Sequence, residues 1–414
     1  MSLTPGGPET LSEALGFSPT VVEIGQPHPG VRRVLTGAGG TTGFVISLDD
    51  ERITDLEVEL GFGHRGFEKE VESVPWHGAL PYVRRLGYSG GLIAEVGYCL
   101  AVESLIGLAL PDRAVWLRML GSELARVVDH FTRLSALSAA IAMPAAEQAA
   151  QWGEVEASRL LRIVTGRGPL EGWLCFGGVR SGLPSDFNES FGEARERLQQ
   201  AVERFRQLAV DNPSCRRRLN DVGGIGSEEA VELGLSGPVL RAAGSSLDVR
   251  RDRPYLAYDS IDFDIPIGSS GDNLDRMLVV TEEVVQSLRI AEQCASLLDS
   301  IGPGEVVDRE SRWTLEGVAS SSSSSSSSAS ATVAASASAP RVPKGEVGLS
   351  VEASTGELGF FLVSDGGELP RRIRCRPPSL FHAQAMPRIL VGERLDDLLP
   401  TAALLHLVSG ECDR

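Results

Sequence analysis

Near the N-terminus the sequence alternates between apolar and polar residues in the way that is typical of β-strands. Within residues 53–60, Leu56, Val58 and Leu60 are separated by single glutamates, and this period of two predicts a strand with one buried face. Three more short strands are expected at residues 20–24, 31–35 and 42–48, with the glycine-rich residues 37–40 as a hairpin connection. We therefore predict a small antiparallel sheet in an N-terminal β region that covers residues 21–68.

From residue 86 onward the apolar residues recur every three or four positions, which is typical of amphipathic helices. The clearest pattern begins after Asp112, which can cap a helix, and has apolar residues at positions 117, 120, 124, 127, 131, 134 and 137. Similar patterns predict helices over residues 86–108, 147–164, 189–210 and 272–301. The expected core is an antiparallel helix bundle within a helical body that covers residues 69–318.

The composition changes sharply after this body. Ser320–Ser328 is a run of nine serines, and residues 319–340 contain neither a charged nor an aromatic side chain. Such a segment buries too little apolar surface to offset the entropy lost on ordering, so we expect residues 319–341 to form a flexible linker. Residues 1–20, rich in Pro, Gly, Ser and Thr, are expected to form a loose tail.

The C-terminal part mixes strands and helix. Strands are expected at residues 346–351, 358–363 and 371–376, followed by a helix over residues 396–408. We expect residues 342–414 to form an α/β segment that completes the same domain. The predicted fold class is therefore α+β: a helical bundle core with a small N-terminal antiparallel sheet and a C-terminal β-containing segment.

The acidic charge balance narrows the choice of partners. The 414 residues include 39 basic and 56 acidic side chains, for a net charge of −17, and such a surface repels the phosphate backbone of nucleic acids. The N-terminus lacks the pattern of a secretory signal, and no apolar stretch reaches the roughly 20 residues that span a bilayer. We therefore expect a protein that is soluble, or held at a membrane through its partners, and that binds no nucleic acid.

The six cysteines are widely spaced: Cys99, Cys175, Cys215, Cys294, Cys375 and Cys412. No Cys-x-x-Cys pair occurs, so the sequence contains no zinc-knuckle, thioredoxin-like or iron–sulfur cluster motif. An isolated cysteine is ordinarily a small core residue, and this usage fits a reducing compartment. We expect this chain to hold neither a metal ion nor a cluster.

A stretch rich in glycine and charge follows the strand at residues 53–60. Leu60-Gly-Phe-Gly-His-Arg-Gly-Phe-Glu-Lys69 combines three glycines with an imidazole, a guanidinium, a carboxylate and an ammonium, and on residue types alone it is an ordinary polar turn. The stretch resembles the Gly-x-x-His-x-Gly-Phe-Glu-Lys signature of the D subunit of proton-pumping NADH–quinone oxidoreductase, respiratory complex I. That family is related to the large subunit of nickel–iron hydrogenases.

Further motifs similar to those of the family follow in the family's order. They include Leu100-Ala-Val-Glu103, Gly177-Gly-Val179, Asp248-Val-Arg250, Asp275-Arg-Met-Leu278, Pro343-Lys-Gly-Glu346 and the ending Gly410-Glu-Cys-Asp-Arg414. The resemblance covers nearly all of residues 22–414. A hydrogenase large subunit holds nickel and iron with two Cys-x-x-Cys pairs, because soft metals need those thiolates. Neither pair is present here, so the sequence excludes a hydrogenase.

The resemblance implies a peripheral-arm subunit of NADH–quinone oxidoreductase, a translocase that acts only as an assembled complex. In the family this subunit helps to form the cavity in which the substrate quinone is reduced, beside the terminal iron–sulfur cluster of a partner subunit. NAD binding and electron transport belong to the complex as a whole, and the clusters and the flavin lie in partner subunits. The expected location is the cytoplasmic side of the bacterial inner membrane, with membrane contact through other respiratory subunits.

The resemblance also assigns two site residues. Aligned without gaps between the two flanking motifs, Tyr88 falls on the family's quinone-headgroup tyrosine and is the expected catalytic residue. A phenol can donate a hydrogen bond to a carbonyl and stack its ring on an apolar wall. Arg85 falls on an arginine beside the terminal cluster, where a permanent positive charge raises the redox potential. Without the resemblance, a buried tyrosine beside a surface arginine is the simpler interpretation.

Several positions depart from the family pattern. The family usually has a second headgroup histidine where this sequence has Arg32, so His28 and Arg32 are the expected quinone-binding residues on that side. The family's partner aspartate, an acidic residue before the tyrosine, a cluster-side histidine and a nearby basic residue are replaced by Ala140, Gly87, Glu171 and Cys175. Proton-donating groups are thus lost on several sides of the expected cavity.

Three functions remain open from the sequence. The chain is an electron-transfer subunit whose quinone cavity has altered chemistry, a divergent paralogue that keeps the fold as a structural scaffold, or a subunit of a related membrane-bound oxidoreductase with another acceptor. The retention of Tyr88, Arg85 and the ending at residues 410–414 favours the first, and the replaced cavity residues favour the second.

Overall fold

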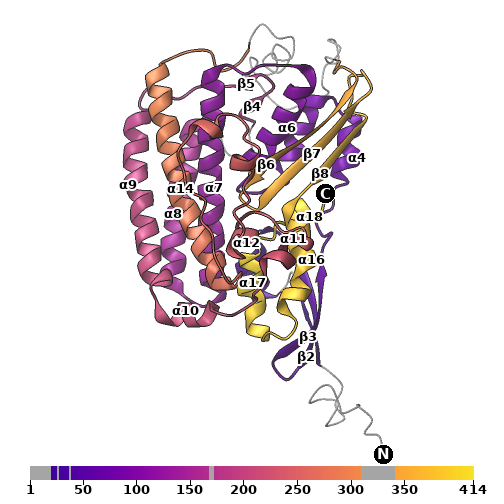
Figure 1. Ribbon diagram of the computed structural model, residues 1–414, viewed down its shortest axis with the longest axis vertical. Coiled ribbons are helices and arrows are strands. Elements are labelled where there is room, and N and C mark those ends of the chain that lie inside the picture. The colour runs from indigo at the N-terminus through magenta and orange to yellow at the C-terminus, as the bar shows by residue number, and fades with distance from the viewer. Residues whose placement is uncertain (1–19, 26–27, 37–38, 167–171, 309–340) are drawn as a thin grey trace, which may run out of the picture.

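Four long helices stand side by side in the computed structural model of the chain (Figure 1). They are α7 (Asp112–Ala140), α8 (Pro144–Thr165), α9 (Phe187–Phe205) and α14 (Asn273–Ile301). The structure describes residues 20–25, 28–36, 39–166, 172–308 and 341–414. The α+β class and the helical bundle predicted from the sequence are confirmed.

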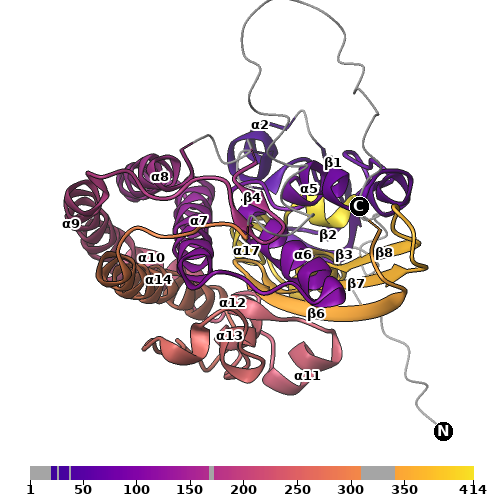
Figure 2. The same cartoon turned by 90° about the horizontal axis from the view of Figure 1, so that it is seen from above.

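The burial of each helix follows its place in the bundle. The outer helix α9 buries one face, formed by Phe191, Leu198 and Phe205 at helical spacing. The central helix α7 is buried on all sides between Leu117 and Ser138, because α8, α14, α6 (Gly91–Ile106) and α17 (Leu398–Leu404) pack around it. Figure 2 shows α7 between these neighbours when the bundle is seen from above.

The start of α6 differs from the sequence prediction. A helix was expected from residue 86, but α6 begins at Gly91 and residues 85–90 form a turn after α5 (Leu80–Arg84). The turn is tight, because a Cβ atom at Gly91 would overlap the carbonyl oxygen of Arg84. The turn carries Tyr88, so the expected site residue is positioned by a turn and not by a helix.

The N-terminal sheet contains three antiparallel strands in the order β1 (Thr20–Ile24), β2 (Gly43–Asp49) and β3 (Arg52–Glu59). The strands expected at residues 20–24, 42–48 and 53–60 are confirmed, and Ile46 and Leu56 pair across the buried face. The expected strand at residues 31–35 is wrong. This segment forms α2 (Pro29–Val31) and a π-helical turn (Arg32–Thr36), so it has no hairpin with β2.

Local chemistry explains that correction. Pro29 stands at the first position of α2, where its fixed φ suits a helix and its missing N–H is not needed. His28 caps the helix, because its Nδ1 atom accepts a hydrogen bond from the Gly30 N–H at 3.2 Å. These two helix-start signals come just before the apolar residues at 31–35 and outweigh the strand pattern of those residues.

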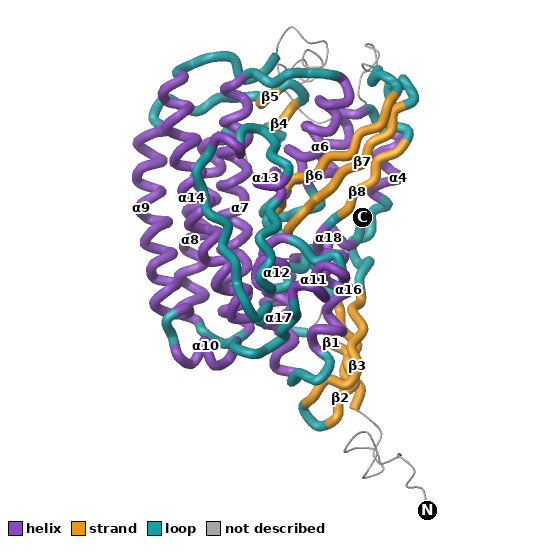
Figure 3. The backbone as a smooth tube through the Cα atoms, viewed as in Figure 1, coloured by secondary structure: helices purple, strands orange, loops and turns teal. Residues whose placement is uncertain are grey.

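The C-terminal sheet is also antiparallel, with the order β6 (Gly345–Ala353), β7 (Gly356–Ser364) and β8 (Arg372–Arg376). Figure 3 shows both three-stranded sheets on the same side of the bundle. The chain then forms α16 (Pro378–Leu390), α17 and α18 (Ser409–Cys412). α16 packs on β3, and the Ile53 N–H donates to the carbonyl of Glu393 at 2.8 Å, so the N-terminal sheet contacts the C-terminal elements.

The remaining α-helices and strands are short. They are α4 (Phe67–Glu70), α10 (Pro213–Leu219), α11 (Ser227–Glu232), α12 (Gly237–Ala242), α13 (Val249–Asp252) and the hairpin of β4 (Leu174–Cys175) with β5 (Gly178–Val179). The expected helix over residues 396–408 ends at Leu404, because His406 has a φ of +60°. The tail at 1–19 and almost all of the expected linker lie outside the described residues, and the domain limits stay a prediction. No helix in the described ranges is both long and apolar enough to cross a bilayer.

Candidate functional site

Tyr88 lies in the turn between α5 and α6, with Gly87 and Gly90 close on either side. Its side chain is 45% exposed, so the expectation of a buried tyrosine that follows without the resemblance is wrong. The phenol oxygen lies 3.0 Å from Oγ of Ser409, the first residue of α18. The phenol is therefore held at its polar end while much of the side chain is open to a ligand.

Two arginines lie close together beside this turn. Arg65 donates from Nη2 to the carbonyl of Arg85 at 3.3 Å, and Arg85 donates from Nη1 to the carbonyl of Pro81 at 3.1 Å. Burial, and then the charge of Arg85, lower the pKa of Arg65. In the part of the chain that the structure describes, no carboxylate forms an ion pair with either guanidinium. The turn therefore presents positive charge on an acidic protein.

His28 and Arg32 stand at the two ends of α2, and both are exposed. The His28 ring is engaged in capping α2, and the Arg32 backbone N–H donates to the carbonyl of His28 at 3.0 Å. Among the described residues, no hydrogen bond joins either side chain to Tyr88. The structure does not bring the three residues into polar contact, and the quinone-binding role of His28 and Arg32 stays a prediction.

A glycine from the N-terminal region closes one side of the Tyr88–Ser409 pair. Gly40 has a φ of +87°, which favours glycine. A Cβ atom there would overlap Oγ of Ser409 and lie 2.7 Å from the phenol oxygen of Tyr88. On this side the pair is therefore bounded by backbone that has no room for a side chain.

The segment before α18 is tied to the central helix by polar side chains. Nε2 of His406 is hydrogen-bonded to Asp129, and Arg133 donates from Nη1 to the carbonyl of Leu407 at 3.2 Å. Burial and the nearby Arg133 lower the pKa of His406 to about 4. Burial opposes the charge of Asp129, but His406 and Arg133 together hold its pKa well below the usual range. The imidazole is thus neutral and Asp129 ionised at neutral pH.

Glu411 is a buried acid close to this segment. It accepts hydrogen bonds from the Ser379 N–H at 3.0 Å, from Ser379 Oγ at 2.5 Å and from Thr355 Oγ1 at 2.9 Å. Burial outweighs these bonds and raises the pKa of Glu411 to about 7. Glu411, Asp129 and Gly87 line the same small cavity, so a titratable acid lies directly beneath the turn that carries Tyr88.

We expect the folded chain to lose stability in acid between about pH 6.5 and pH 4. Burial lowers the pKa of His406 to about 4 and that of His382 to about 3, against 6.5 for an ordinary histidine. The unfolded chain binds more protons in this window, so the stability carried by the neutral rings is complete above pH 6.5 and falls as the pH decreases. Each histidine contributes a slope of up to about 1.4 kcal/mol per pH unit.

The raised pKa of Glu411 acts in the opposite direction between pH 4.5 and 7, so the net slope corresponds to about one proton. Thermal unfolding from pH 8 to pH 4.5 checks this for the parent chain and for His382→Leu. The midpoint of the variant should vary much less with pH than that of the parent. Equal pH dependence of the two midpoints would show that His382 is not buried in its neutral form.

The signature stretch at residues 60–69 is hydrogen-bonded to the C-terminal part of the chain. The N–H groups of Gly61 and Gly63 each donate to the carboxylate of Asp413 at 2.6 Å. Glu68 accepts from the Cys375 N–H at 2.9 Å and from Arg372 at 3.0 Å. These matching sequence phrases therefore have a structural role: they hold the C-terminal turn against the N-terminal region.

A network of buried charges joins α7 and α14 of the bundle to α12, α13 and β6. Arg241 contacts Glu283 at 2.6 Å and Glu352 at 2.8 Å, and Arg250 contacts Asp248 at 2.7 Å and Glu123 at 3.3 Å. All six side chains are almost fully buried. Each charge has an opposite partner, which is the condition under which ions persist in a protein core. The Asp248–Arg250 phrase of the sequence belongs to this network.

One group of side chains has the residue types of a metal site. Asp129, His130 and His406 bring possible ligand atoms within 4.8 Å of one another. The Nε2 atoms are engaged, however: His406 with Asp129, and His130 with Glu283 at 2.8 Å. The positive charge of Arg133 lies close enough to depress the pKa of His406. The group therefore fits a hydrogen-bonded network better than a cation site.

The cysteines do not provide an alternative metal site. All six are free thiols, five buried and one half-buried, and burial raises the pKa of each. Protonated thiols are poor metal ligands. Within the described ranges no cysteine belongs to a group of three possible ligands, so these residues do not fit an iron–sulfur cluster.

We expect the purified chain to contain neither nickel nor an iron–sulfur cluster in stoichiometric amount, because its thiols are separated and buried. Elemental analysis of the isolated chain is the measurement. One equivalent of nickel or iron that survives dialysis against a chelator would contradict this expectation.

The replaced cavity positions are only partly visible. Ala140 is the last residue of α7 and is half-buried, and Cys175 is buried in β4 with a pKa that burial raises to about 11. Glu171 lies outside the described residues. The alanine side chain cannot ionise, and the Cys175 thiol is protonated at neutral pH.

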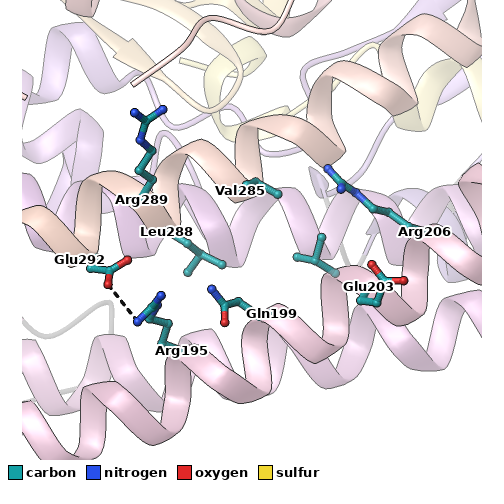
Figure 4. Close-up of a pocket in the computed structure, with 9 residues that line it drawn as sticks. Arg195, Gln199, Glu203, Arg206, Val285, Leu288, Arg289 and Glu292 are labelled. Atoms are coloured by element: carbon teal, nitrogen blue, oxygen red, sulfur yellow. Dashed lines mark ion pairs between the residues drawn. The ribbon is translucent and has the colours of Figure 1, made fainter. Parts of the chain in front are cut away.

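A groove of about 250 Å³ lies between α9 and α14 (Figure 4). Its charged side chains have partners: Arg195 pairs with Glu292 at 2.9 Å, and Arg289 with Asp264 at 3.0 Å. The two helices stand on the far side of the bundle from α5 (Figure 2). The groove is therefore separate from the Tyr88 turn, which remains the better candidate site.

Sequence reasoning missed Gly40, Ser409 and the Asp129–His406 pair. Tyr88 and Ser409 are 321 positions apart, so no local spacing connects them. The available signals were the glycine-rich residues 37–40 and the motif at residues 410–414. They indicate that the backbone conformation is important in both segments, but they do not indicate which residues the segments contact.

The chain is similar to one family of known proteins. Residues 155–414 match the family described as "Respiratory-chain NADH dehydrogenase, 49 Kd subunit". The chain is 35% identical over 405 residues to the NADH-quinone oxidoreductase D 1 subunit of Anaeromyxobacter dehalogenans (strain 2CP-C), covering 95% of this chain and 89% of that protein. It is 34% identical to the D subunit of Myxococcus xanthus (strain DK1622), covering 95% and 92% of the two chains.

A third relative is longer. The NADH-quinone oxidoreductase C/D subunit of Nitrosospira multiformis is 32% identical over 420 residues, which cover 98% of this chain and 67% of that protein. The similarity to these relatives therefore extends over almost the whole chain, including the Tyr88 turn and the C-terminal elements.

Proposed function

This chain belongs to the family of the 49 kDa subunit of respiratory-chain NADH dehydrogenase, and from that premise we propose that it forms one wall of the quinone-reduction cavity of NADH–quinone oxidoreductase. In this proposal the cavity lies beside the terminal iron–sulfur cluster of a partner subunit. The chain contributes the groups that bind and orient the quinone, and its activity exists only in the assembled complex.

The state of Tyr88 is the observation that carries this proposal. Its side chain is 45% exposed although its hydroxyl is hydrogen-bonded to Ser409. A large aromatic side chain that is open to a ligand and fixed at its polar end can stack on a quinone ring and donate to a carbonyl oxygen. The Tyr88 hydroxyl is the group that would hold the headgroup.

The positive charge beside Tyr88 has a role in the same site. Arg85 and Arg65 lie next to each other without carboxylate partners among the described residues. A fixed positive charge favours the arrival of negative charge nearby, so it would favour electron transfer to the quinone and raise the potential of a cluster docked against the turn. The electrons come from the partner's cluster, since the thiols of this chain do not fit one.

The partners follow from the same proposal. The relative from Nitrosospira multiformis is named as a C/D subunit, which supports a direct association between this chain and a C-type subunit of the complex. Other partners carry the clusters and the flavin and make the membrane contact, which places the chain at the cytoplasmic face of the bacterial inner membrane. No nucleic acid is involved.

A second candidate function is a structural scaffold, either in this complex or in a related membrane-bound oxidoreductase. The observation that favours it is the loss of proton donors. Arg32 and Ala140 stand where the family has other groups, and within the described part of the chain neither His28 nor Arg32 is hydrogen-bonded to Tyr88. In that case the chain would hold its partners in place without forming a site for quinone reduction.

The two functions differ in how electrons leave the assembled complex. If this chain forms the quinone site, the complex should reduce both a short-chain quinone and hexacyanoferrate with NADH, and a complex depleted of this chain should keep only the hexacyanoferrate activity. An intact complex that reduces hexacyanoferrate but no quinone would favour the scaffold.

Arg32→His provides a smaller prediction. A guanidinium cannot release a proton, since its pKa is above about 12, whereas an imidazole can do so near neutral pH. We expect Arg32→His to retain or raise the quinone turnover of the complex. Steady-state turnover with a short-chain quinone checks this. A loss of turnover with normal assembly would mean that the positive charge of Arg32 is required.

A further inference from the structure

The C-terminal turn carries a residue that neither the sequence pattern nor the resemblance assigns. We propose that Ser409 is a positioning residue for quinone reduction: its hydroxyl orients the Tyr88 phenol and donates to the phenol oxygen while the phenol hydrogen is donated to the quinone. This inference rests on the proposed role of Tyr88 and adds the residue through which that role is set.

The argument begins with the hydrogens of the pair. Tyr88 and Ser409 each have one hydroxyl hydrogen, and their oxygens are 3.0 Å apart. If Tyr88 donates to Ser409, no phenol hydrogen remains for a substrate. If Ser409 donates to Tyr88, the phenol hydrogen is free, and a phenol that accepts one hydrogen bond is a stronger donor in another. A quinone carbonyl, which only accepts, therefore selects the second arrangement.

The backbone around Ser409 fixes the position of its hydroxyl. Ser409 is 3% exposed, and its carbonyl accepts from the Asp413 N–H at 2.7 Å. The next residue, Gly410, touches the Tyr88 turn itself: a Cβ atom there would lie 2.6 Å from the Arg85 carbonyl oxygen and 2.7 Å from that of Leu86. The buried serine is the fixed member of the pair, and the exposed tyrosine is the member that needs orienting.

Gly40 limits the positions that the Tyr88 and Ser409 side chains can take. With a φ of +87° and no room for a Cβ atom beside Ser409 Oγ and the Tyr88 ring, it forms a wall of backbone against both side chains. A side chain at residue 40 would displace either the serine hydroxyl or the phenol. The geometry of the donor thus depends on three segments that are distant in sequence.

The first test uses Ser409→Ala and Ser409→Thr in the assembled complex. Loss of one hydrogen bond of about 1 kcal/mol should lower kcat/KM for a short-chain quinone by about fivefold in Ser409→Ala, with hexacyanoferrate reduction unchanged. Ser409→Thr keeps the hydroxyl and should recover most of the parent value. Ser138→Ala is the matched control, because Ser138 is also buried but its Oγ donates to the carbonyl of Leu134 within α7.

A double-mutant cycle separates positioning from packing. If Ser409 acts through the phenol hydroxyl, Ser409→Ala should have no further effect in the Tyr88→Phe background. An equal loss in both backgrounds would overturn the inference, because Ser409 would then act independently of Tyr88. Parent-like turnover of Ser409→Ala alongside impaired Tyr88→Phe would overturn this inference and leave the proposed function standing. Parent-like turnover of Tyr88→Phe would remove the role of Tyr88, and this inference with it.

Gly40→Ala tests the same geometry without removing either hydroxyl. It should lower quinone turnover at least as much as Ser409→Ala, since it displaces the pair. Gly107→Ala is the matched control: Gly107 also has a positive φ, +68°, but apart from its own helix and chain neighbours no atom of the described residues lies within 4 Å of its Cβ position, so it reproduces the backbone strain alone. Equal turnover of the two glycine variants would overturn the proposed role of the Tyr88–Ser409 pair.

Discussion

Glu103→Ala should destabilise the folded chain by about 3–5 kcal/mol, because it leaves a buried arginine without its counter-charge. Glu103 and Arg118 form two parallel hydrogen bonds of 2.7 and 2.8 Å, and both side chains are buried. Burial disfavours the charged guanidinium, yet Glu103 keeps the pKa of Arg118 above its ordinary value. The same carboxylate accepts from the Gly177 N–H at 2.8 Å, so the β4–β5 hairpin should loosen as well.

Denaturant unfolding of the purified chain measures this loss. The matched control is Glu193→Ala, which breaks a pair with Arg197 on the surface of α9, where both side chains are about half exposed. A surface pair of this kind contributes about 0–1 kcal/mol. Similar changes in the free energy of unfolding for the two variants would contradict the account of the buried pair.

Tyr88→Phe should lower quinone reduction by the assembled complex about tenfold or more. The substitution removes the hydroxyl and keeps the ring, so the loss reports the hydrogen bond donated to the quinone, which is worth roughly 1.5 kcal/mol. Reduction of hexacyanoferrate should not change, because the proposed role of Tyr88 begins where electrons reach the quinone. Turnover with a short-chain quinone, at equal complex content, is the measurement.

The control for Tyr88→Phe is Tyr82→Phe, which removes a phenol hydroxyl from the neighbouring helix α5. If Tyr88→Phe has parent-like quinone turnover, the assignment of the cavity to this turn is wrong. If both tyrosine variants lose activity together with complex content, the effect lies in assembly and not in the headgroup site.

Helix periodicity predicted the bundle because its outer members bury one continuous face. Phe191, Leu198 and Phe205 on α9 are an example. The expected strand at residues 31–35 was wrong because a local signal, Pro29 after a capping His28, outweighed the apolar pattern. α16 was missed because Pro387 lies inside it, where proline disfavours a helix, although its buried face packs on β3.

Tertiary contacts limited the rest of the prediction. The helix expected to residue 408 ends at Leu404, and His406 then adopts a positive φ where its ring meets Asp129 on α7. Periodicity within the C-terminal segment contains no information about α7. The fold class could therefore be predicted, whereas the ends of several elements could not.

The candidate site was predictable only in part for the same reason. Tyr88 and Arg85 came from the family resemblance and lie together on one exposed turn. The residues that hold the phenol, Gly40 and Ser409, come from opposite ends of the chain and meet only in the folded protein. A single sequence indicates that such glycines and serines exist but not which of them touch the site.

The most direct test of the central claim is photolabelling of the assembled complex with a photoreactive short-chain quinone, followed by peptide mapping. If this chain forms the quinone cavity at the Tyr88 turn, residues 85–90 should carry the label, and an excess of unlabelled quinone should prevent it. Label that is confined to other subunits, or label on this chain that excess quinone does not displace, would contradict the claim.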